Sequence, residues 1–366
     1  MAKPSGSDSA NCVLTDPRCI GNAIPALRRR AVLSGSCALL FGSAWPALAD
    51  IKAVEGAASK EGQVTWYVAS IDSRNAETAG QIFTTKYGIK VNVVRAASQI
   101  MFQRLSQDLA QGAANADVFS SVDIANFIDL KQEGALALYR PENAARLFPV
   151  FQNLDPDGYF YSTVASVIAL AYNTQKVRAA DAPKSWTDLL DPKWTDKIAL
   201  GHPAYSGFAG SWAAQMYKLY GKSYFERMAK LRPQVSRSLL DATTLLTSGE
   251  RWVTASPISP LVESADKGNP IAIVYPSDGS ILVQTPSAVM KNAPHPNAAR
   301  LFMEFLLSVE FSQVLIKARY ESMRPDVKPL PGVKPVSEIK TIRPTLDDQV
   351  KGIPAIAELW RDIFGQ

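Results

Sequence analysis

The sequence contains little cysteine, and the few cysteines lie near its beginning. Three are present among 366 residues, at Cys12, Cys19 and Cys37. The chain after Cys37 can therefore form neither a disulfide bond nor a thiolate metal site. We expect this part of the protein to be stabilised by the burial of apolar side chains alone.

Histidine and the short motifs of common enzymes are also scarce. The two histidines, His202 and His295, do not have the spacing of a zinc site, and we expect His295 to be an exposed residue ahead of a helix. The segment 204–208, Ala-Tyr-Ser-Gly-Phe, lacks both glycines of the Gly-x-Ser-x-Gly hydrolase motif. No Walker-type glycine-rich loop occurs. We therefore predict a protein that is not an enzyme and has no catalytic residues, no cofactor and no metal ligands.

Long hydrophobic runs are missing except near the beginning of the chain. Arg28–Arg30 precede an uncharged run, Ala31–Leu48, which ends in the small residues of Ala47-Leu48-Ala49. This order predicts a signal peptide that is cleaved between Ala49 and Asp50, and hence a periplasmic protein. The paired arginines also permit twin-arginine export. An uncleaved membrane anchor is the alternative, although the run is interrupted by glycine and proline and an anchor needs about 20 apolar residues.

Charge of one sign does not dominate the sequence. Lysine and arginine number 39 against 34 aspartates and glutamates, a net charge of +5, and part of this excess lies in the leader. Nucleic-acid binding proteins usually carry a stronger basic excess, so we predict that nucleic acid is not a partner. We expect a monomer that is not embedded in a membrane and that binds a small-molecule solute.

Strand and helix patterns alternate after residue 62. Apolar spacing, helix caps and glycine stops predict strand 63–68, helix 75–86, strand 89–94, a helix from 98 until Gly112, strand 117–119 and helix 123–133. Ser98 is the expected cap of the fourth element, and a later helix is expected over 211–220. Such alternation predicts a mostly parallel sheet with helices on both faces, the α/β class.

Two long β-rich runs interrupt this alternation. They cover Tyr159–Tyr172 and, with a short break, Ile271–Val289, and each is long enough to pass from one lobe to another. We therefore predict a leader over 1–49, a discontinuous first lobe over 50–164 and 276–366, and a second lobe over 165–275. The hinge is expected at 161–165 and 274–277, with a cleft between the lobes.

Several segments carry a resemblance to a known family. They are Ser185–Trp194 with Lys197–Leu200, Ala293–Ala299 running into Phe302–Ser308, and Arg319–Glu321 with Arg324–Val327. In this order, they resemble the type II periplasmic substrate-binding proteins of ABC importers, especially the ferric-iron-binding group. The resemblance implies a two-lobed fold that captures a solute and delivers it to an ABC permease in the inner membrane.

The ferric members of that group hold metal through a histidine after the first strand, a glutamate after the third, and a pair of tyrosines in the second lobe. Here, the matching positions are Ile71, Val122 and the tyrosine-free stretch Val253–Pro260. Ile and Val cannot coordinate iron. Asp72 and Asp123 lie one residue along, where a side chain usually points elsewhere. The resemblance therefore does not imply that this chain binds a metal.

Hydroxyl residues follow the predicted strands, where strand ends and helix N-termini present unpaired N–H groups to anions. Each serine can also serve simply as a helix cap. Arg74 is the favoured cation, with Arg95, Arg237 and Arg251 as rivals, and Asp278 can be a turn former beside Gly279. The predicted ligand-binding set is Ser70, Asp72, Arg74, Ser98, Ser121, Tyr205, Ser206, Gly207, Thr254, Ser256, Tyr275 and Asp278.

The sequence thus predicts an extracytoplasmic binding protein for a small polar, anionic or zwitterionic solute. An organic or phosphorus-containing anion suits neutral hydroxyl donors better than bare iron does. Ferric iron completed by an exogenous anion is the first alternative, and a secreted hydrolase is the second. The identity of the solute is not encoded in any motif of the chain.

Overall fold

The computed structural model describes residues 51–237, 239–331 and 333–365. The described residues lie within one compact unit. The predicted signal peptide and its cleavage site lie outside the described residues. No helix in the described ranges is long and apolar enough to cross a membrane.

One ten-stranded sheet runs through the described chain in the order β2-β1-β3-β9-β4-β7-β5-β6, with β10 beside β9 and β8 beside β4. The strands are β1 (Gln63–Val68), β2 (Lys90–Arg95), β3 (Val118–Ser120), β4 (Phe160–Asn173), β5 (Ile198–Gly201), β6 (Gln234–Ser236), β7 (Val253–Pro257), β8 (Ile271–Val274), β9 (Ser280–Val289) and β10 (Thr341–Ile342).

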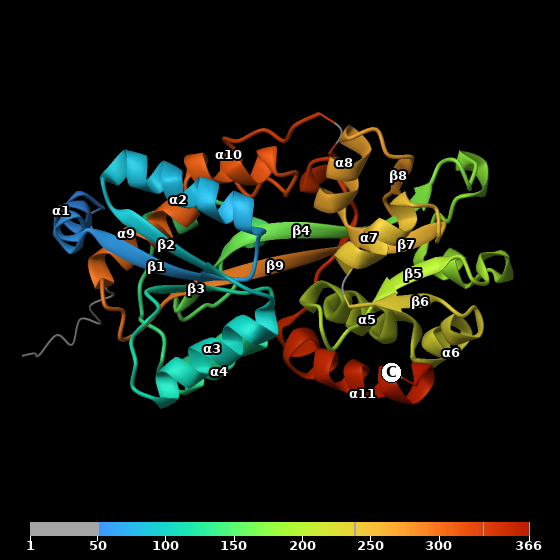
Figure 1. The fold of residues 1–366 in the computed structure, drawn as a ribbon, viewed down its shortest axis with the longest axis horizontal. Coiled ribbons are helices and arrows are strands. Elements are labelled where there is room, and N and C mark those ends of the chain that lie inside the picture. Colours follow the sequence, from blue (N-terminus) through green and yellow to red (C-terminus); the bar gives the residue numbers. More distant parts are fainter. Residues whose placement is uncertain (1–50, 238, 332, 366) are drawn as a thin grey trace, which may run out of the picture. The chain divides into compact units, whose positions relative to one another are not determined.

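Two parallel parts of the sheet are joined by two antiparallel strands. β1 pairs in parallel with β2 and β3, and β5 pairs in parallel with β6 and β7. Between them, β4 pairs antiparallel with β9 over most of its length and with β7 toward its end. Figure 1 shows β4 and β9 running from the β1–β3 part to the β5–β7 part. The prediction that two long runs cross between the parts of the fold is confirmed.

Helices cover both faces of the sheet (Figure 1). They are α1 (Ile51–Glu61), α2 (Ser73–Tyr87), α3 (Ser98–Ala110), α4 (Ala125–Gln132), α5 (Gly207–Tyr220), α6 (Lys222–Lys230), α7 (Leu239–Thr247), α8 (Ile258–Asp266), α9 (Pro296–Leu306), α10 (Val309–Lys317) and α11 (Ile353–Phe364). The predicted α/β class is therefore correct. The predicted lobe boundaries stay a prediction, and α11 contacts α5 and α6, which that prediction places in the other lobe.

The alternation of side chains along β1 explains the two cores of the β1–β3 part. Trp66 and Val68 are buried in the cluster formed with α2, α9 and α10, whereas Tyr67 is buried in the cluster with α3 and α4. Successive residues of a strand point to opposite faces, so one strand serves both clusters. Trp66 meets Phe302 edge to face, with ring centroids 5.1 Å apart. A third cluster, containing Trp212, fills the β5–β7 part.

Two local predictions need correction. The cap position of α3 is Ala97, which makes no side-chain cap bond, and Ser98 is the first helical residue instead. The helix expected over 211–220 begins at Gly207, because Ser206 caps it by accepting a hydrogen bond from the Ala209 N–H. The difference in α5 matters for the site, since it brings a helix N-terminus to the 202–207 loop.

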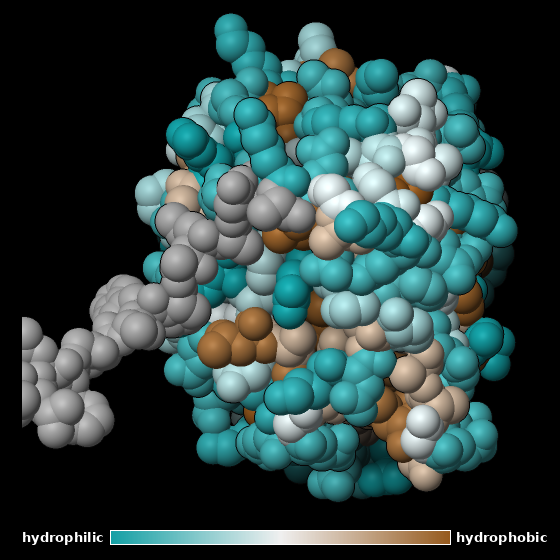
Figure 2. Space-filling view, turned by 90° about the vertical axis from the view of Figure 1, so that its left-hand side faces the viewer, coloured by the Kyte–Doolittle hydropathy of each residue, from teal (hydrophilic) through white to brown (hydrophobic). Residues whose placement is uncertain are grey.

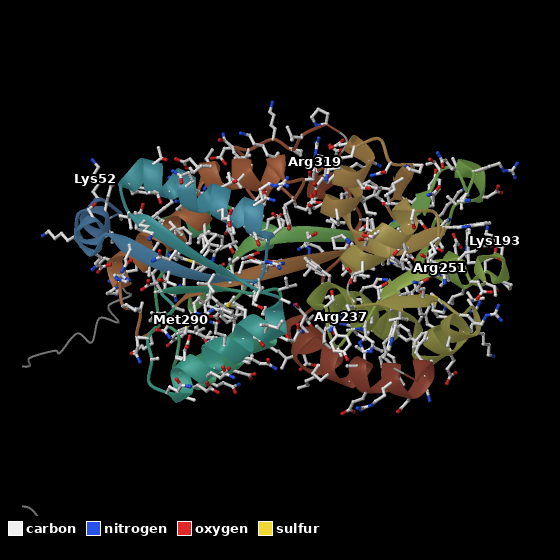
Figure 3. The ribbon with its side chains drawn as sticks, in the orientation of Figure 1. Lys52, Lys193, Arg237, Arg251, Met290 and Arg319 are labelled. Carbon is white, nitrogen blue, oxygen red and sulfur yellow. The ribbon has the colours of Figure 1, made fainter. Side chains whose placement is uncertain are left out.

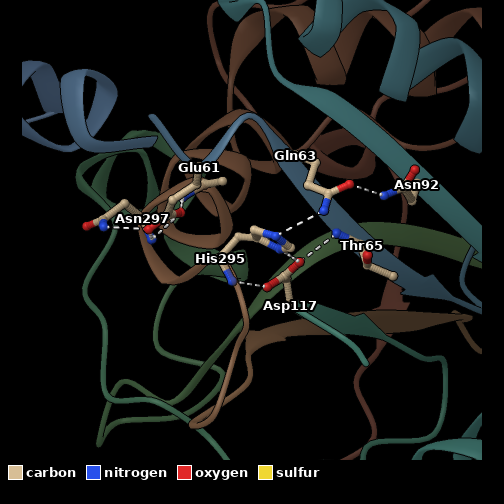
Figure 4. Close-up of polar contacts among 8 residues, drawn as sticks. Glu61, Gln63, Thr65, Asn92, Asp117, His295 and Asn297 are labelled. Carbon is tan, nitrogen blue, oxygen red and sulfur yellow. Dashed lines mark hydrogen bonds and ion pairs between the residues drawn. The ribbon is translucent and has the colours of Figure 1, made fainter. Parts of the chain in front are cut away.

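His295 was also placed wrongly by the sequence, which predicted an exposed residue. Its side chain is only 20% exposed, and its Nδ1 lies 2.9 Å from Oδ2 of the fully buried Asp117. The Asp117 carboxylate also accepts hydrogen bonds from the His295 N–H at 2.7 Å and the Thr65 N–H at 2.7 Å (Figure 4). Gln63 joins His295 to Asn92 in the same network. This network fastens the start of α9 to β1 and β3.

Figure 2 shows the surface at the α1 end of the described chain. Hydrophilic residues cover most of this face, and hydrophobic residues form small separate patches. Single exposed apolar side chains are common on protein surfaces, so these patches mark no particular site.

Candidate functional site

The candidate site is built from the loops after β1 and β3 and from the loop before α5. Val122, after β3, belongs to the hydrophobic cluster of the β5–β7 part. A Cβ atom at Gly207, the first residue of α5, would lie 3.0 Å from Val122 Cγ1. The β3 loop and the N-terminus of α5 are therefore in close contact, and only glycine fits this approach without a shift of its neighbour.

Ser70 lies in the loop after β1 and has an unusual environment. The residue is 4% exposed, and its Oγ has no hydrogen-bond partner in the described part of the chain. A buried hydroxyl without a partner costs free energy, so such a group is expected to bind a ligand or an ordered water. Ser70 is therefore the member of the predicted set whose surroundings point most directly to a bound solute.

Arg95 ends β2 and lies beside this loop. Its Nε donates a hydrogen bond to the Ile71 carbonyl oxygen at 3.3 Å, and its two Nη atoms make no hydrogen bond within the described residues. The guanidinium is thus oriented by the loop and still has donors available, the arrangement that suits a bidentate anion. Arg74, which the sequence favoured, lies on α2, and both arginines are exposed. The two differ in that Arg95 is oriented by the loop after β1.

Asp72 and Tyr320 complete the surroundings of Arg95. Asp72 caps α2 and accepts a hydrogen bond from the Asn75 N–H at 3.1 Å, so its carboxylate has a structural role. Burial, with a contribution from the Asp72 carboxylate, raises the pKa of the Tyr320 hydroxyl, and the Arg95 guanidinium opposes this shift. Tyr320 therefore keeps its proton at neutral pH and remains a hydrogen-bond donor. The sequence indicated Tyr320 only within a segment that resembles the family, Arg319–Glu321, and the predicted ligand-binding set did not include it.

Ser120 and Ser121, after β3, have different partners. Ser120 Oγ accepts a hydrogen bond from Trp66 Nε1 at 2.8 Å and lies 2.5 Å from Ser287 Oγ, which in turn lies 2.6 Å from Thr163 Oγ1. These buried hydroxyls tie β1, β3, β9 and β4 together. Ser121 Oγ accepts bonds at 3.3 Å and 3.4 Å from the Asp123 N–H and the Asn126 amide. A ligand-binding role for Ser121 stays a prediction.

The loop before α5 holds two predicted site residues, Tyr205 and Ser206. Tyr205 is 62% exposed, and its ring lies 4.7 Å from that of His202. His202 Nδ1 accepts a hydrogen bond from the Ala204 N–H at 3.1 Å, which fixes the loop. Ser206 caps the helix. The free N–H groups of the first turn of α5 therefore open beside Val122, and helix N-termini favour anions.

Other predicted residues already have partners inside the protein. Thr254 Oγ1 donates to the Ala199 carbonyl oxygen at 2.9 Å, and Ser256 Oγ lies 2.8 Å from Thr243 Oγ1. The Tyr275 hydroxyl accepts a hydrogen bond from the Lys334 N–H at 3.3 Å. Their use as ligand contacts is untested and stays a prediction, as it does for Ser98, which is buried at the start of α3.

Asp278 binds protein groups rather than standing free. Its Oδ2 accepts hydrogen bonds from the Trp186 N–H at 2.9 Å and from the Tyr220 hydroxyl at 2.7 Å, whereas Oδ1 is buried without a partner in the described chain. Burial, together with this bond, raises the pKa of Tyr220. The carboxylate thus fastens the turn after β8 to α5 and to the Trp186 segment.

The remaining rival arginines lie on the β5–β7 part of the fold. Figure 3 places Arg237 nearer to the β1–β3 part than Arg251, which lies toward the far end of β5.

Arg319 forms an ion pair with Asp266 of α8 at 2.7 Å, and Ser259 of α8 donates a hydrogen bond to the Ala318 carbonyl oxygen at 2.6 Å. These two contacts hold α8 against the segment that contains Tyr320.

The described residues provide no obvious metal centre. Among them, no three His, Cys, Asp or Glu side chains come together in a way that could hold a metal ion. Ile71 and Val122, at the positions where the resemblance expects ferric ligands, are 2% and 5% exposed and pack in hydrophobic clusters. The chemistry of the site is therefore that of hydroxyl, guanidinium and backbone N–H donors.

Comparison with known proteins gives the family. The description "Bacterial extracellular solute-binding protein" matches residues 113–338. A periplasmic protein of Salmonella paratyphi A, named for 2-aminoethylphosphonate binding, is 22% identical over 92% of this chain and 98% of its own length. Iron-bound HitA from Pseudomonas aeruginosa is similar with a TM-score of 0.72 at 24% identity, over 82% of this chain and 99% of that one.

A further solved structure is similar to the same extent. AfuA from Actinobacillus pleuropneumoniae, with exogenous fructose-6-phosphate bound, has a TM-score of 0.72 at 22% identity and covers 83% of this chain and 99% of its own. These likenesses show the two-lobed fold of type II periplasmic binding proteins. The chain therefore belongs to the family of bacterial extracellular solute-binding proteins.

Proposed function

We propose that this protein binds a small anion or zwitterion that carries a phosphonate, phosphate ester or carboxylate group, between the loops after β1 and β3 and the N-terminus of α5. It then delivers this solute to the permease of an ABC importer in the inner membrane. The observation that carries the proposal is the buried Ser70 hydroxyl, which has no hydrogen-bond partner among the described residues, beside the oriented guanidinium of Arg95.

The donors at the site suit anionic oxygen atoms. Ser70, the Nη atoms of Arg95 and the first N–H groups of α5 can all donate, and phosphonate and phosphate oxygens accept several hydrogen bonds at once. The Salmonella relative aligns with nearly the whole of this chain, and its name supports a phosphonate as the first compound to test. Ferric iron with a bridging anion is the alternative that the same experiment examines.

The proposal also states that the protein lies outside the cytoplasm and that it does not chemically change its solute. The family is extracytoplasmic, and we propose cleavage between Ala49 and Asp50, which mass determination of the exported protein would check. We also propose that the protein is a monomer and has no enzymatic activity. Bound solute should accordingly be recovered unchanged after prolonged incubation.

Residues 50–366 purified without refolding provide the test. Native mass spectrometry would reveal a retained solute, and thermal unfolding would then be followed with 2-aminoethylphosphonate, phosphate esters, citrate and ferric citrate. A hundredfold excess of a true ligand over its Kd stabilises the protein by about 2.7 kcal/mol. Stabilisation by ferric ion alone, with none from any anion, would overturn the proposal.

Two variants locate the site. Arg95→Gln and Ser70→Ala should each raise the Kd at least tenfold, since a hydrogen bond to a charged group contributes about 1.5–3 kcal/mol. Lys90→Gln, an exposed change at the other end of β2, should leave the Kd unchanged. Equal affinities for all three variants would place the solute elsewhere.

A further inference from the structure

A cavity lies outside the candidate site, between two irregular segments of the chain. It has a volume of about 530 Å³ and is formed by residues 148–151 on one side and by parts of the segment 322–343 on the other. None of its lining residues belongs to the candidate site. The Phe148 N–H donates a hydrogen bond to the Met323 carbonyl oxygen at 2.9 Å, which holds the two sides together.

Slightly more than half of the surface that lines this cavity is apolar. Its wall is formed by aromatic, valine and proline side chains, namely Phe148, Pro149, Val150, Phe151, Pro325, Val327, Pro329, Pro335 and Val336. Proline also lacks the backbone N–H, so the wall presents few donors. The Ser322 hydroxyl, which borders the cavity, donates to the carbonyl oxygens of Arg324 and Val327 and is thus already used. Such a surface favours an apolar group of a ligand.

Two cations border the same cavity. Lys328 and Arg343 line it and are exposed. Neither makes an ion pair or a hydrogen bond with the residues that the structure describes, and none of the lining residues is acidic. The neighbouring Arg324, in contrast, is paired with Asp326 at 2.8 Å. The cavity therefore combines an apolar wall with uncompensated positive charge.

We propose that this cavity is a second binding site, which takes an amphipathic organic anion. The apolar part of the ligand lies against Phe148, Phe151 and Val336, and its carboxylate meets Lys328 and Arg343. A volume of about 530 Å³ is in the range of small-molecule sites, which usually span roughly 300–1,000 Å³. The site is independent of the solute proposed for the loops after β1 and β3.

The cavity is also joined to a crossing strand. Gln284 of β9 donates a hydrogen bond to the Val150 carbonyl oxygen at 3.4 Å. Arg343 directly follows β10, which pairs with the beginning of β9. A ligand between residues 148–151 and Arg343 would therefore contact two segments that are both fastened to β9.

Octanoate is the probe, titrated calorimetrically into residues 50–366. Acetate, which lacks the long apolar chain, and octanol, which lacks the charge, are the controls. We expect one site per chain and an affinity for octanoate at least tenfold above that for either control. The double variant Lys328→Met, Arg343→Met should lose at least tenfold in affinity for octanoate. Lys317→Met, an exposed change on α10, should lose none.

The same titration distinguishes this site from the first one. Arg95→Gln, which is expected to weaken binding of the main solute, should leave octanoate binding unchanged. The proposal is overturned if octanoate fails to bind at millimolar concentration, if the double variant binds it as well as the wild type does, or if Arg95→Gln abolishes its binding. Failure of the main solute to bind would leave the octanoate result unaffected.

Discussion

Glu321 is a buried carboxyl group whose ionisation should control the stability of the protein. It is 2% exposed, and its Oε1 has no hydrogen-bond partner in the described chain. Its backbone N–H donates to the Ala165 carbonyl oxygen at 3.3 Å, which places it against the crossing strand β4. Burial raises the pKa of the Glu321 carboxyl from 4.5 to about 8, because the charged form loses its hydration.

The sign of the pH dependence follows from this shift. Below pH 4.5, both the native and the unfolded protein hold the proton, and the contribution to stability is complete. Between pH 4.5 and pH 8, only the native state holds it, so the free energy of unfolding falls by about 1.4 kcal/mol for each pH unit. The loss reaches about 3 kcal/mol at pH 7 and about 5 kcal/mol above pH 8.

Glu321→Gln isolates this effect, because the amide keeps the shape of the protonated carboxyl and cannot ionise. Urea unfolding of the wild type and the variant at pH 5, 7 and 8.5 should give nearly equal stabilities at pH 5. The variant should be more stable by about 3 kcal/mol at pH 7 and by more at pH 8.5. Glu338→Gln, at an exposed position, should show no such trend. A Glu321→Gln difference that stays constant with pH would refute the reasoning.

Three further predictions concern contacts in the core and at the site. The buried Glu304 carboxylate accepts hydrogen bonds from the Tyr139 hydroxyl and from the Glu142 and Asn143 N–H groups. Glu304→Gln replaces one of its oxygens with a donor, so the free energy of unfolding in urea should drop by about 2–4 kcal/mol. An unchanged urea midpoint would contradict this prediction. Asp117→Asn should destabilise by about 2–3 kcal/mol in the same assay, because one oxygen that accepts N–H bonds becomes a donor; equal stability would show that the amide can replace it. Gly207→Ala should raise the Kd of the solute at least tenfold, because the alanine Cβ would lie 3.0 Å from Val122 Cγ1. An unchanged Kd in calorimetry would mean that this contact is absent when solute is bound.

Much of the fold could be predicted because its signals are local. In β1, Val64, Trp66 and Val68 belong to one core and Tyr67 to the other, as the period of two along a strand requires. The crossing strands β4 and β9 were recognised by their length, which exceeds that of an ordinary strand. Helix ends were less certain. Ser98 has the right residue type for a cap, yet the chain places Ala97 in that position.

The candidate site depended on contacts that no local signal contains. The sequence favoured Arg74 over Arg95, but it is Arg95 that donates a hydrogen bond to the Ile71 carbonyl oxygen. Thr254 and Ser256 have donors of the expected kind, yet these already bond neighbouring groups. Residue type and spacing state which groups are present, and they do not state which groups are already paired.

The sequence by itself determined the alternation of strands and helices from β1 to α4, the crossing of two long strands and the absence of the ferric ligands at Ile71 and Val122. These depend on neighbouring residues or on residue identity alone. Only the tertiary structure decided that Ser70 is buried with no partner in the part of the chain that the structure describes, whereas Ser120 bonds Ser287, 167 residues away. A hydroxyl group is available to a solute only when no distant part of the chain has satisfied it, and that is settled when the chain is folded.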